Sequence, residues 1–322
     1  MQEVRIPLKN IIKFGQRTML EDDVFNVSWI LGRFCNYKCS YCWPYANSST
    51  LDFSELYTYK SVVDRIHAQS SANGFSKIHW SLSGGEPTTY KHLIELVSHI
   101  AEYEEEQTIH MTSNISPGIK WWDKWERDTR KFARRSITAS FHAEFAKENK
   151  FIEKCLHLNK LGIRLVVNQV MVPELFGETY ARLAKMYELG INVTMKPQSD
   201  ETASSIVYGY TEEMLSLMQQ GFPQKYDGRE ISQIVMHDVG GETYYMDQAE
   251  RFNAFGFNEF SGWKCNAGYQ GLIIRGDTIK RGYSCNDEPI GNLQEFKLFS
   301  SPVKCSTPRC VSSADSKIPK FK

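Results

Sequence analysis

Six short β-rich runs alternate with helical patterns between Val24 and Pro197, and this alternation limits the possible folds more than any other feature. Repeated β–α units of this kind build a parallel sheet that is covered by helices. The predicted strands are 25–31, 78–82, 108–112, 137–141, 164–170 and 192–195. The sequence therefore predicts an α/β fold for this part of the chain.

The segment before Gly162 illustrates the helical patterns. Apolar residues recur at helical spacing from Phe151 to Leu161, and Gly162 follows as a stop signal. Cys155 lies on this apolar stripe, and a free cysteine in such a place behaves as a small apolar residue. We therefore expect Cys155 to belong to the core.

The pattern changes after about Ser199. A helix is predicted over 212–220, and Gly240-Gly241 and Arg275-Gly276-Asp277 are expected at the turns of two hairpins. We expect three parts, with boundaries at 1–200, 201–262 and 263–322. The middle part is rich in aromatic residues, which suit either stacking on sugars or an ordinary core. They are Tyr208, Tyr210, Tyr244, Tyr245, Phe252, Phe255 and Phe257.

The overall charge argues against polyanionic partners. The 322 residues include 38 Lys and Arg and 38 Asp and Glu, so no net field attracts nucleic acid or an anionic membrane. No apolar run has the length of a signal peptide core or a membrane span. We expect a soluble cytoplasmic protein. Its eight cysteines should then be reduced, so their spacing indicates metal or redox chemistry.

Three of the cysteines follow the first predicted strand at close spacing. They are Cys35, Cys39 and Cys42, and coincidence is a poor explanation when the chain has only eight. Three thiolates can hold a four-iron cluster and leave one iron open. A zinc loop that borrows a distant fourth ligand is the alternative.

A second motif, Ser83-Gly84-Gly85-Glu86-Pro87-Thr88, follows the second predicted strand. Paired glycines let a ligand approach the backbone closely, and a neighbouring carboxylate can receive an ammonium group. Taken alone, the motif could be any tight turn between a strand and a helix.

Taken together, the two motifs resemble those of the radical S-adenosylmethionine superfamily. They read Cys-x3-Cys-x2-Cys, with Tyr41 before the last cysteine, and Gly-Gly-Glu-Pro. The resemblance covers about Val24 to Pro197 and implies a partial (β/α)6 TIM-like barrel. Its open mouth, at the carboxyl ends of the strands, would hold S-adenosylmethionine and a 4Fe-4S cluster on Cys35, Cys39 and Cys42.

The resemblance also assigns residues to the methionine and adenine parts of the cofactor. It gives Gly84, Gly85 and Glu86, with Pro87 in the same turn, to the methionine amino group. It gives Tyr41 to the adenine.

Further assignments lie at the ends of later strands. Ser113 and Asn114 stand where the family often has Thr-Asn-Gly, and Ser140 matches the serine of its frequent Ser-x-Asp-Gly. His142 stands in place of the aspartate of that pattern. It is the one catalytic candidate, on the substrate side or the ribose side. A hydrogen-bonded polar residue without catalytic function is the alternative for His142. Asn168 is a candidate ribose contact.

The tail carries four more cysteines, Cys265, Cys285, Cys305 and Cys310, the number that a complete 4Fe-4S shell requires. The hairpin between the first two would bring them together. The arrangement resembles the Twitch extension, the shorter relative of the SPASM domain, and implies a small iron-sulfur domain with an auxiliary 4Fe-4S cluster. A four-cysteine zinc site is the alternative.

The resemblance implies a radical enzyme. A low-potential donor of the flavodoxin or ferredoxin type would supply the electron that cleaves S-adenosylmethionine to methionine and a 5′-deoxyadenosyl radical. This radical would take hydrogen from a substrate. A fully ligated auxiliary cluster could accept an electron, so we expect net dehydrogenation.

A small carbohydrate-like metabolite is the expected substrate, because a compact barrel with one auxiliary cluster resembles enzymes that oxidise an alcohol on a carbohydrate or aminocyclitol. Too few residues precede the first predicted strand for the leader-binding domain that peptide-modifying relatives often carry. A separate protein could instead bind the leader of a peptide substrate, and this chain would then need no such domain. The alternatives are a peptide-modifying enzyme that cross-links or epimerises, and a non-catalytic iron-sulfur sensor that binds S-adenosylmethionine.

Overall fold

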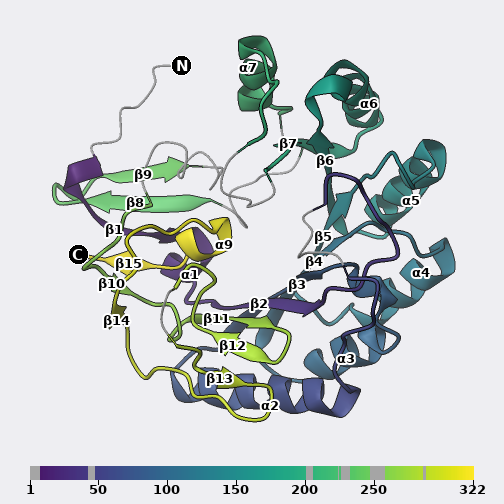
Figure 1. The fold of residues 1–322 in the computed structure, drawn as a ribbon. Helices are drawn as coiled ribbons and strands as arrows, with labels where there is room; N and C mark the ends of the chain where they lie inside the picture. Colours follow the sequence, from purple (N-terminus) through teal and green to yellow (C-terminus); the bar gives the residue numbers. More distant parts are fainter. Residues whose placement is uncertain are drawn as a thin grey trace. The chain divides into compact units, whose positions relative to one another are not determined.

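The computed structural model describes residues 8–42, 48–200, 206–223, 225, 233–246, 258–285 and 288–322 (Figure 1). The chain forms two compact units, each described by itself. The first comprises Met1–Trp29, Tyr57–Trp80 and Asp227–Lys322, and the second comprises Ile30–Leu56 and Ser81–Tyr226. The predicted boundaries at about residues 200 and 262 stay a prediction.

The alternating strands and helices that the sequence predicts are present, mostly in the second unit, and residues 25–29 and 77–80 of the first two strands belong to the first unit. These strands pair in the order β2-β3-β4-β5-β6-β7, and the pairs from β4 to β7 are parallel. They are β2 (Phe25–Gly32), β3 (Lys77–Gly84), β4 (Glu106–Ser113), β5 (Arg134–Ser140), β6 (Arg164–Met171) and β7 (Asn192–Pro197). All six predicted strands are confirmed.

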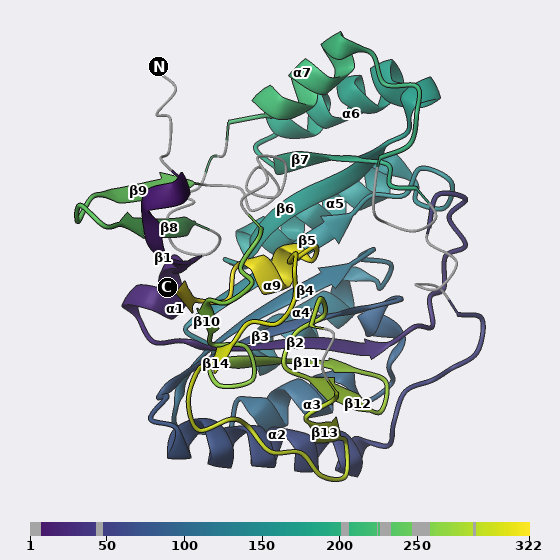
Figure 2. The ribbon, with the colours of Figure 1, turned by 60° about the vertical axis from the view of Figure 1, so that its left-hand side comes forward.

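Helices follow the strands of this unit, and α5 and α6 pack on β6 (Figure 2). The helices are α3 (Leu93–Ile100), α4 (Ile119–Asp128), α5 (Glu148–Lys160), α6 (Phe176–Glu188) and α7 (Glu212–Gln220), with 3-10 turns at Pro87–Thr89 and Pro173–Leu175. Cys155 is completely buried on α5, as expected. The predicted helix over 212–220 is confirmed as α7.

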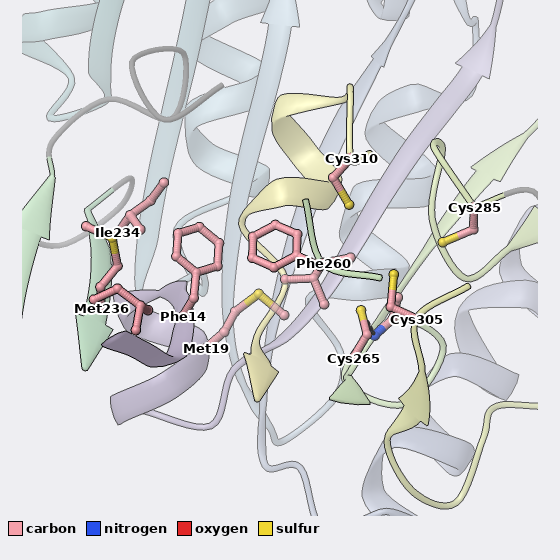
Figure 3. Close-up of a cluster of buried hydrophobic side chains, with 12 residues drawn as sticks. Phe14, Met19, Ile234, Met236, Phe260, Cys265, Cys285, Cys305 and Cys310 are labelled. Carbon is pink, nitrogen blue, oxygen red and sulfur yellow. Dashed lines mark hydrogen bonds between the residues drawn. The ribbon is translucent and has the colours of Figure 1, made fainter. Parts of the chain in front are cut away.

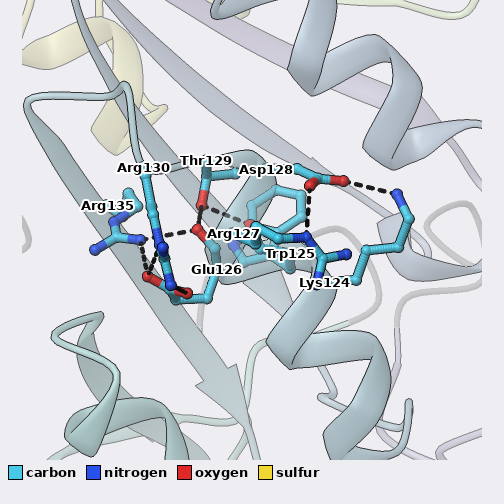
Figure 4. A network of polar contacts seen from close by, with 8 residues as sticks. All are labelled: Lys124, Trp125, Glu126, Arg127, Asp128, Thr129, Arg130 and Arg135. Carbon is cyan, nitrogen blue, oxygen red and sulfur yellow. Dashed lines mark hydrogen bonds and ion pairs between the residues drawn. The ribbon is translucent and has the colours of Figure 1, made fainter.

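The two faces of this sheet differ in chemistry because side chains alternate between them. On β4, Ile109 and Met111 are buried, whereas His110 and Thr112 are half-buried. The apolar set lies on the side of the helices, since Arg135 of β5 reaches back to Glu126 of α4 (Figure 4). The opposite face of β4 and β5, here called the polar face, consists of Thr108, His110, Thr112, Ser136, Thr138 and Ser140.

A polar network fixes α4 against β5 at the helix end (Figure 4). The Glu126 carboxylate accepts two hydrogen bonds of 2.9 Å from Arg130 and one of 3.2 Å from Arg135. The Arg130 and Arg135 guanidinium groups hold the pKa of Glu126 below its usual value. The network thereby ties the end of α4 to the start of β5, the strand that leads to the candidate site.

The first unit is rich in β-structure, which the sequence predicts for the chain after about residue 200. One sheet has the order β14-β10-β15-β1-β8-β9, and β13, β12 and β11 continue in that order to their neighbour β2. The strands are β1 (Ile11–Gln16), β8 (Ile234–Asp238), β9 (Thr243–Met246), β10 (Lys264–Cys265), β11 (Gly271–Arg275), β12 (Thr278–Lys280), β13 (Gly291–Asn292), β14 (Val303–Lys304) and β15 (Lys320–Phe321). Its helices are α1 (Arg17–Glu21), α2 (Leu56–Ala72) and α9 (Ser313–Ser316), and η1 is a 3-10 turn at Leu8–Asn10.

Both predicted hairpins are confirmed, whereas β1, β10, β13, β14 and β15 were not predicted. The pairs β8–β9 and β11–β12 are antiparallel and enclose the predicted turns. The expectation that the first strand begins near Phe25 is corrected, because β1 precedes it. β1 pairs with β8 and β15, which lie more than 200 residues away in the sequence, so no local sequence pattern predicts this strand. Phe252, Phe255 and Phe257 lie outside the described residues.

Among the described residues, no helix is both long enough and apolar enough to cross a bilayer.

Candidate functional site

The loop after β2 carries the first three cysteines, all with free thiols. Cys35 and Cys39 are half-buried and Cys42 is exposed. The turn is held by hydrogen bonds from the Cys42 amide to the Cys39 carbonyl (3.1 Å) and from the Tyr37 amide to Cys35 Sγ (3.3 Å). Burial raises the pKa of Cys39 to about 12. Bound iron would supply the positive charge that favours the thiolate form.

Asp52 anchors the start of this loop. Its carboxylate accepts two hydrogen bonds of 2.8 Å from the Arg33 amide and one of 3.1 Å from the Phe34 amide. A carboxylate that accepts from consecutive amides makes charge-assisted bonds, so it fixes the direction in which the chain leaves β2.

The glycine turn after β3 lies directly against the cysteine loop. The Gly85 amide donates to the Gly32 carbonyl and the Glu86 amide to the Phe34 carbonyl, each over 2.8 Å. A Cβ on Gly84 would lie 2.1 Å from the Gly32 oxygen, and Gly84 has a φ of +137°. Only glycine permits this approach. The structure thus brings together the two motifs that the sequence singles out.

Glu86 ties the end of β3 to the end of β4. It is 1% exposed. One carboxylate oxygen accepts from the Thr88 amide (3.1 Å), the Thr88 hydroxyl (2.6 Å) and the Ser113 hydroxyl (2.8 Å), and the other accepts from the Asn114 amide (2.5 Å). Burial raises the pKa of Glu86, and these hydrogen bonds oppose the rise. The assignment of Glu86, with Pro87, to S-adenosylmethionine stays a prediction.

An amide pair links the end of β4 to the cysteine loop. The Asn114 side chain donates to Asn36 Oδ1 (2.8 Å), and the Asn36 side chain donates to Ser116 Oγ (2.9 Å). Asn36 directly follows Cys35, so the predicted site residue Asn114 lies beside the first cysteine. Sequence reasoning did not single out Asn36.

The turn after Asn114 contains an unusual backbone conformation. Ile115 is completely buried and has a φ of +45°, a value that β-branched residues rarely adopt. The Lys154 ammonium on α5 donates to the carbonyls of Ile115 (2.5 Å) and Ser116 (3.2 Å). Sequence reasoning missed Lys154, because it belongs to no motif and is one of several lysines on its helix.

His142 contacts Tyr41 of the cysteine loop. The Tyr41 hydroxyl lies 2.9 Å from His142 Nδ1, and the two rings stack with centroids 5.9 Å apart. Burial lowers the pKa of His142 to about 4 and raises that of Tyr41. The neutral imidazole therefore accepts a hydrogen bond from the Tyr41 hydroxyl at Nδ1. His142 thus has a polar partner within the protein, and its catalytic assignment stays a prediction.

Ser140 ends β5, and Asn168 lies on the neighbouring strand β6, three residues before its end. Ser140 stands opposite Asn168 in the β5–β6 register, and Asn168 stands opposite Thr194 in the β6–β7 register. Thr194 donates a hydrogen bond to Asn168 Oδ1. All the residues predicted for the first cluster and its cofactor therefore lie in the second unit, at the carboxyl ends of the strands.

The four tail cysteines are buried together in the first unit (Figure 3). Cys265, Cys285, Cys305 and Cys310 share an apolar cluster that includes Phe260. Burial raises the pKa of Cys285 to about 12 and that of Cys310 to about 11. The structure thus gathers into one region cysteines that span 46 positions of the sequence.

A buried lysine accompanies these cysteines. Lys320 has no exposed surface, and its ammonium donates to the carbonyls of Asp315 and Ile318, both over 2.8 Å. Its charge opposes the rise in the pKa of Cys305 and Cys310. The same charge would offset the negative charge of a thiolate-ligated centre.

The two cysteine sets suit iron-sulfur clusters by ligand type and number. Within the described residues, no three His, Cys, Asp or Glu side chains converge so as to hold one metal ion. Each thiolate of a 4Fe-4S cluster binds a different iron, so such ligands stand farther apart than those of a single ion. Three and four thiols match an open cluster and a fully ligated one.

Comparison with known proteins identifies relatives of this chain. The model of the Radical SAM superfamily matches residues 29–190. The GTP 3′,8-cyclase of Mannheimia succiniciproducens is 24% identical over 186 residues, which cover 55% of this chain and 54% of that protein. The GTP 3′,8-cyclase of Crocosphaera subtropica is 32% identical over 83 residues, covering 25% of this chain and 23% of that protein. The chain thus spans about half or less of the curated relatives it matches.

Solved structures show the same fold over a longer stretch. Native anSMEcpe with bound AdoMet has a TM-score of 0.54 at 13% identity, covering 85% of this chain and 79% of that one. Streptococcus suis SuiB bound to precursor peptide SuiA has a TM-score of 0.51 at 15% identity, covering 84% of this chain and 63% of that one. Each of these structures covers a larger share of this chain than the half that the family model matches. The structural likeness therefore includes residues outside 29–190. The predicted α/β architecture with a β-rich C-terminal part is confirmed.

Proposed function

Because this chain belongs to the radical SAM superfamily, we propose that it cleaves S-adenosylmethionine reductively and uses the 5′-deoxyadenosyl radical to dehydrogenate a small, carbohydrate-like substrate. The meeting of the cysteine loop with the glycine turn carries this proposal. Cys35, Cys39 and Cys42 hold a 4Fe-4S cluster and leave one iron for the methionine group. When bound, this cluster supplies the electron that cleaves the cofactor.

The residues around the loop bind and orient the cofactor. Gly84 and Gly85 permit close approach to the backbone, and Glu86 keeps the ends of β3 and β4 in register. Ser140 and Asn168 offer polar groups to the ribose from neighbouring strands. The Tyr41–His142 pair keeps the aromatic ring of Tyr41 in place for the adenine.

The polar face of the sheet supports a polar substrate. On β4, His110 lies 2.9 Å from the Ser136 hydroxyl and 3.2 Å from the Thr138 hydroxyl. A half-buried face of hydroxyl and imidazole groups offers hydrogen bonds and little apolar contact, so it suits a substrate rich in hydroxyl groups.

The buried tail cysteines support net oxidation. Cys265, Cys285, Cys305 and Cys310 would fully ligate an auxiliary 4Fe-4S cluster, which leaves no iron for substrate and suits electron transfer. A flavodoxin- or ferredoxin-type protein would donate the first electron, and the auxiliary cluster would accept the electron released when the substrate radical is oxidised.

Peptide modification is the second candidate. It is favoured by SuiB bound to its precursor peptide and by anSMEcpe with a bound Kp18Cys peptide, both of which share this fold. The names of the curated relatives add GTP as a further compound to test.

The decisive experiment measures 5′-deoxyadenosine from reconstituted, dithionite-reduced protein under anaerobic conditions. We expect the wild type to form it and Cys35→Ala, Cys39→Ala and Cys42→Ala to abolish it, because each removes one of the three iron ligands. Cys155→Ala is the matched control, since this buried cysteine lies in the core and should leave cleavage unchanged.

A wild type that binds iron but forms no 5′-deoxyadenosine would overturn the proposal and favour a non-catalytic sensor. The substrate class is decided by adding aminocyclitols and sugars, peptides or GTP. A product two mass units lighter than an added alcohol supports dehydrogenation.

A further inference from the structure

The loop between β5 and α5 contacts the cysteine loop at more places than the Tyr41–His142 pair. The rings of Tyr37 and Phe145 stack with centroids 5.1 Å apart and planes inclined by 16°. Tyr37 lies between Cys35 and Cys39 in the sequence. Two aromatic contacts, one in each half of the cysteine loop, therefore pack it against the loop after β5.

A carboxylate provides the third contact. Glu144 accepts hydrogen bonds from the Ser40 amide at 3.0 and 3.2 Å and from the Ser40 hydroxyl at 2.7 Å. Hydrogen bonds to an ionised acceptor are stronger than those between neutral groups. Ser40 lies between Cys39 and Cys42, so fixing its backbone fixes the part of the loop that carries these two ligands.

Glu144 also places negative charge beside the cysteines. The Ser40 amide and hydroxyl that donate to this carboxylate belong to the residue directly after Cys39. The net charge and hydrogen bonding around an iron-sulfur cluster help to set its reduction potential, and a nearby negative charge disfavours the added electron. Because Glu144 is exposed, solvent screens this interaction, so its effect on the potential should be modest.

We propose that Glu144 is a positioning residue that holds the cysteine loop against the β5–α5 loop and, through its charge, lowers the reduction potential of the cluster on that loop. The inference rests on the proposed function, because it requires a cluster on Cys35, Cys39 and Cys42. A lower potential makes the reduced cluster a stronger donor to S-adenosylmethionine.

Two variants of the full chain separate the effect of the Glu144 hydrogen bonds from the effect of its charge. Glu144→Gln keeps an oxygen that can accept from the Ser40 amide and hydroxyl but removes the charge, whereas Glu144→Ala removes both. Glu148→Gln is the matched control, because it removes a carboxylate four residues later that pairs with Arg182 and Lys185.

Two measurements are made on each reconstituted protein. The first is the midpoint potential of the cluster whose electron paramagnetic resonance signal changes when S-adenosylmethionine is added. The second is amide hydrogen exchange in the peptide that covers residues 35–42.

We expect a more positive midpoint potential in both Glu144 variants, and faster exchange over residues 35–42 in Glu144→Ala alone. Glu148→Gln should match the wild type in both measurements. An unchanged potential in Glu144→Gln, or unchanged exchange in Glu144→Ala, overturns the inference. Failure of the proposed function is seen separately, as a wild type without a signal that responds to S-adenosylmethionine.

Discussion

Ile115 and Lys154 show how one residue compensates for another at the edge of the candidate site. A buried isoleucine at φ +45° persists only where its surroundings hold it there. Ser113 Oγ accepts from the Ile115 amide (2.9 Å), and Lys154 donates to the Ile115 carbonyl. The turn that presents Asn114 to the cysteine loop thus depends on a lysine from another element.

Replacing Lys154 by methionine should weaken the binding of S-adenosylmethionine about tenfold, which corresponds to about 1.4 kcal/mol. The methionine fills a similar volume but leaves the carbonyls of Ile115 and Ser116 without this donor. Unfolding free energy should fall by about 1–3 kcal/mol. Calorimetric titration of the reconstituted protein and urea unfolding check both values.

Two further variants test whether the loss of affinity comes from the missing hydrogen-bond donor at position 154. Lys154→Arg should restore most of the affinity, because a guanidinium also donates to carbonyls, and Lys150→Met should have no effect, because Lys150 is an exposed residue of the same helix. Equal affinities in Lys154→Met and the wild type would contradict the role given to Lys154.

At the scale of elements, the close approach of the ends of β2 and β3 creates the candidate site. A Cβ on Gly85 would lie 2.2 Å from the Phe34 carbonyl oxygen and 2.3 Å from that of Arg33. These are backbone atoms of the segment that leads to Cys35, so they cannot move away without moving the cysteine loop.

Gly85→Ala should therefore reduce the iron bound by the loop and lower the unfolding free energy by about 1–3 kcal/mol. Iron analysis after reconstitution and the urea midpoint measure the two effects. Gly118→Ala serves as the control, because no atom outside its chain neighbours lies within 4 Å of a Cβ there. Wild-type iron content in Gly85→Ala would show that the approach is not needed.

The elements that sequence reasoning predicted are those with a local signature. The strands β2 to β7 have enough alternating residues to be recognised, and both hairpin turns contain glycine. β10 and β13 to β15 have two residues each, and β1 depends on distant partners. The same reasoning applies to the site: Cys35 and Gly84 belong to motifs, whereas Lys154 and Glu144 gain their roles only through contacts across the fold.

For the whole molecule, two cysteine sets in two units predict two clusters. The intact protein should bind about eight irons, and the double variant Cys265→Ala, Cys285→Ala about four, because only the loop cluster remains. The double variant should still form 5′-deoxyadenosine but lose oxidised product. Iron, sulfide and zinc analysis of both proteins, with Cys155→Ala as the control, makes the measurement. Zinc in the tail, or about four irons in the intact protein, would contradict a second cluster.

The strand order of the first unit has a consequence for the way the protein matures in the cell. Phe14 of β1 stands opposite Met236 of β8 and Lys320 of β15, so the sheet beside the tail cysteines closes only after residue 320 has left the ribosome. The second unit is complete at Tyr226, about a hundred residues earlier in synthesis. With a cluster on each cysteine set, as proposed, the loop cysteines would be in place for iron before the tail cysteines are brought together, so the loop centre would be the first to fill. On the same proposal, protein made under iron limitation would carry the loop centre and lack the tail centre.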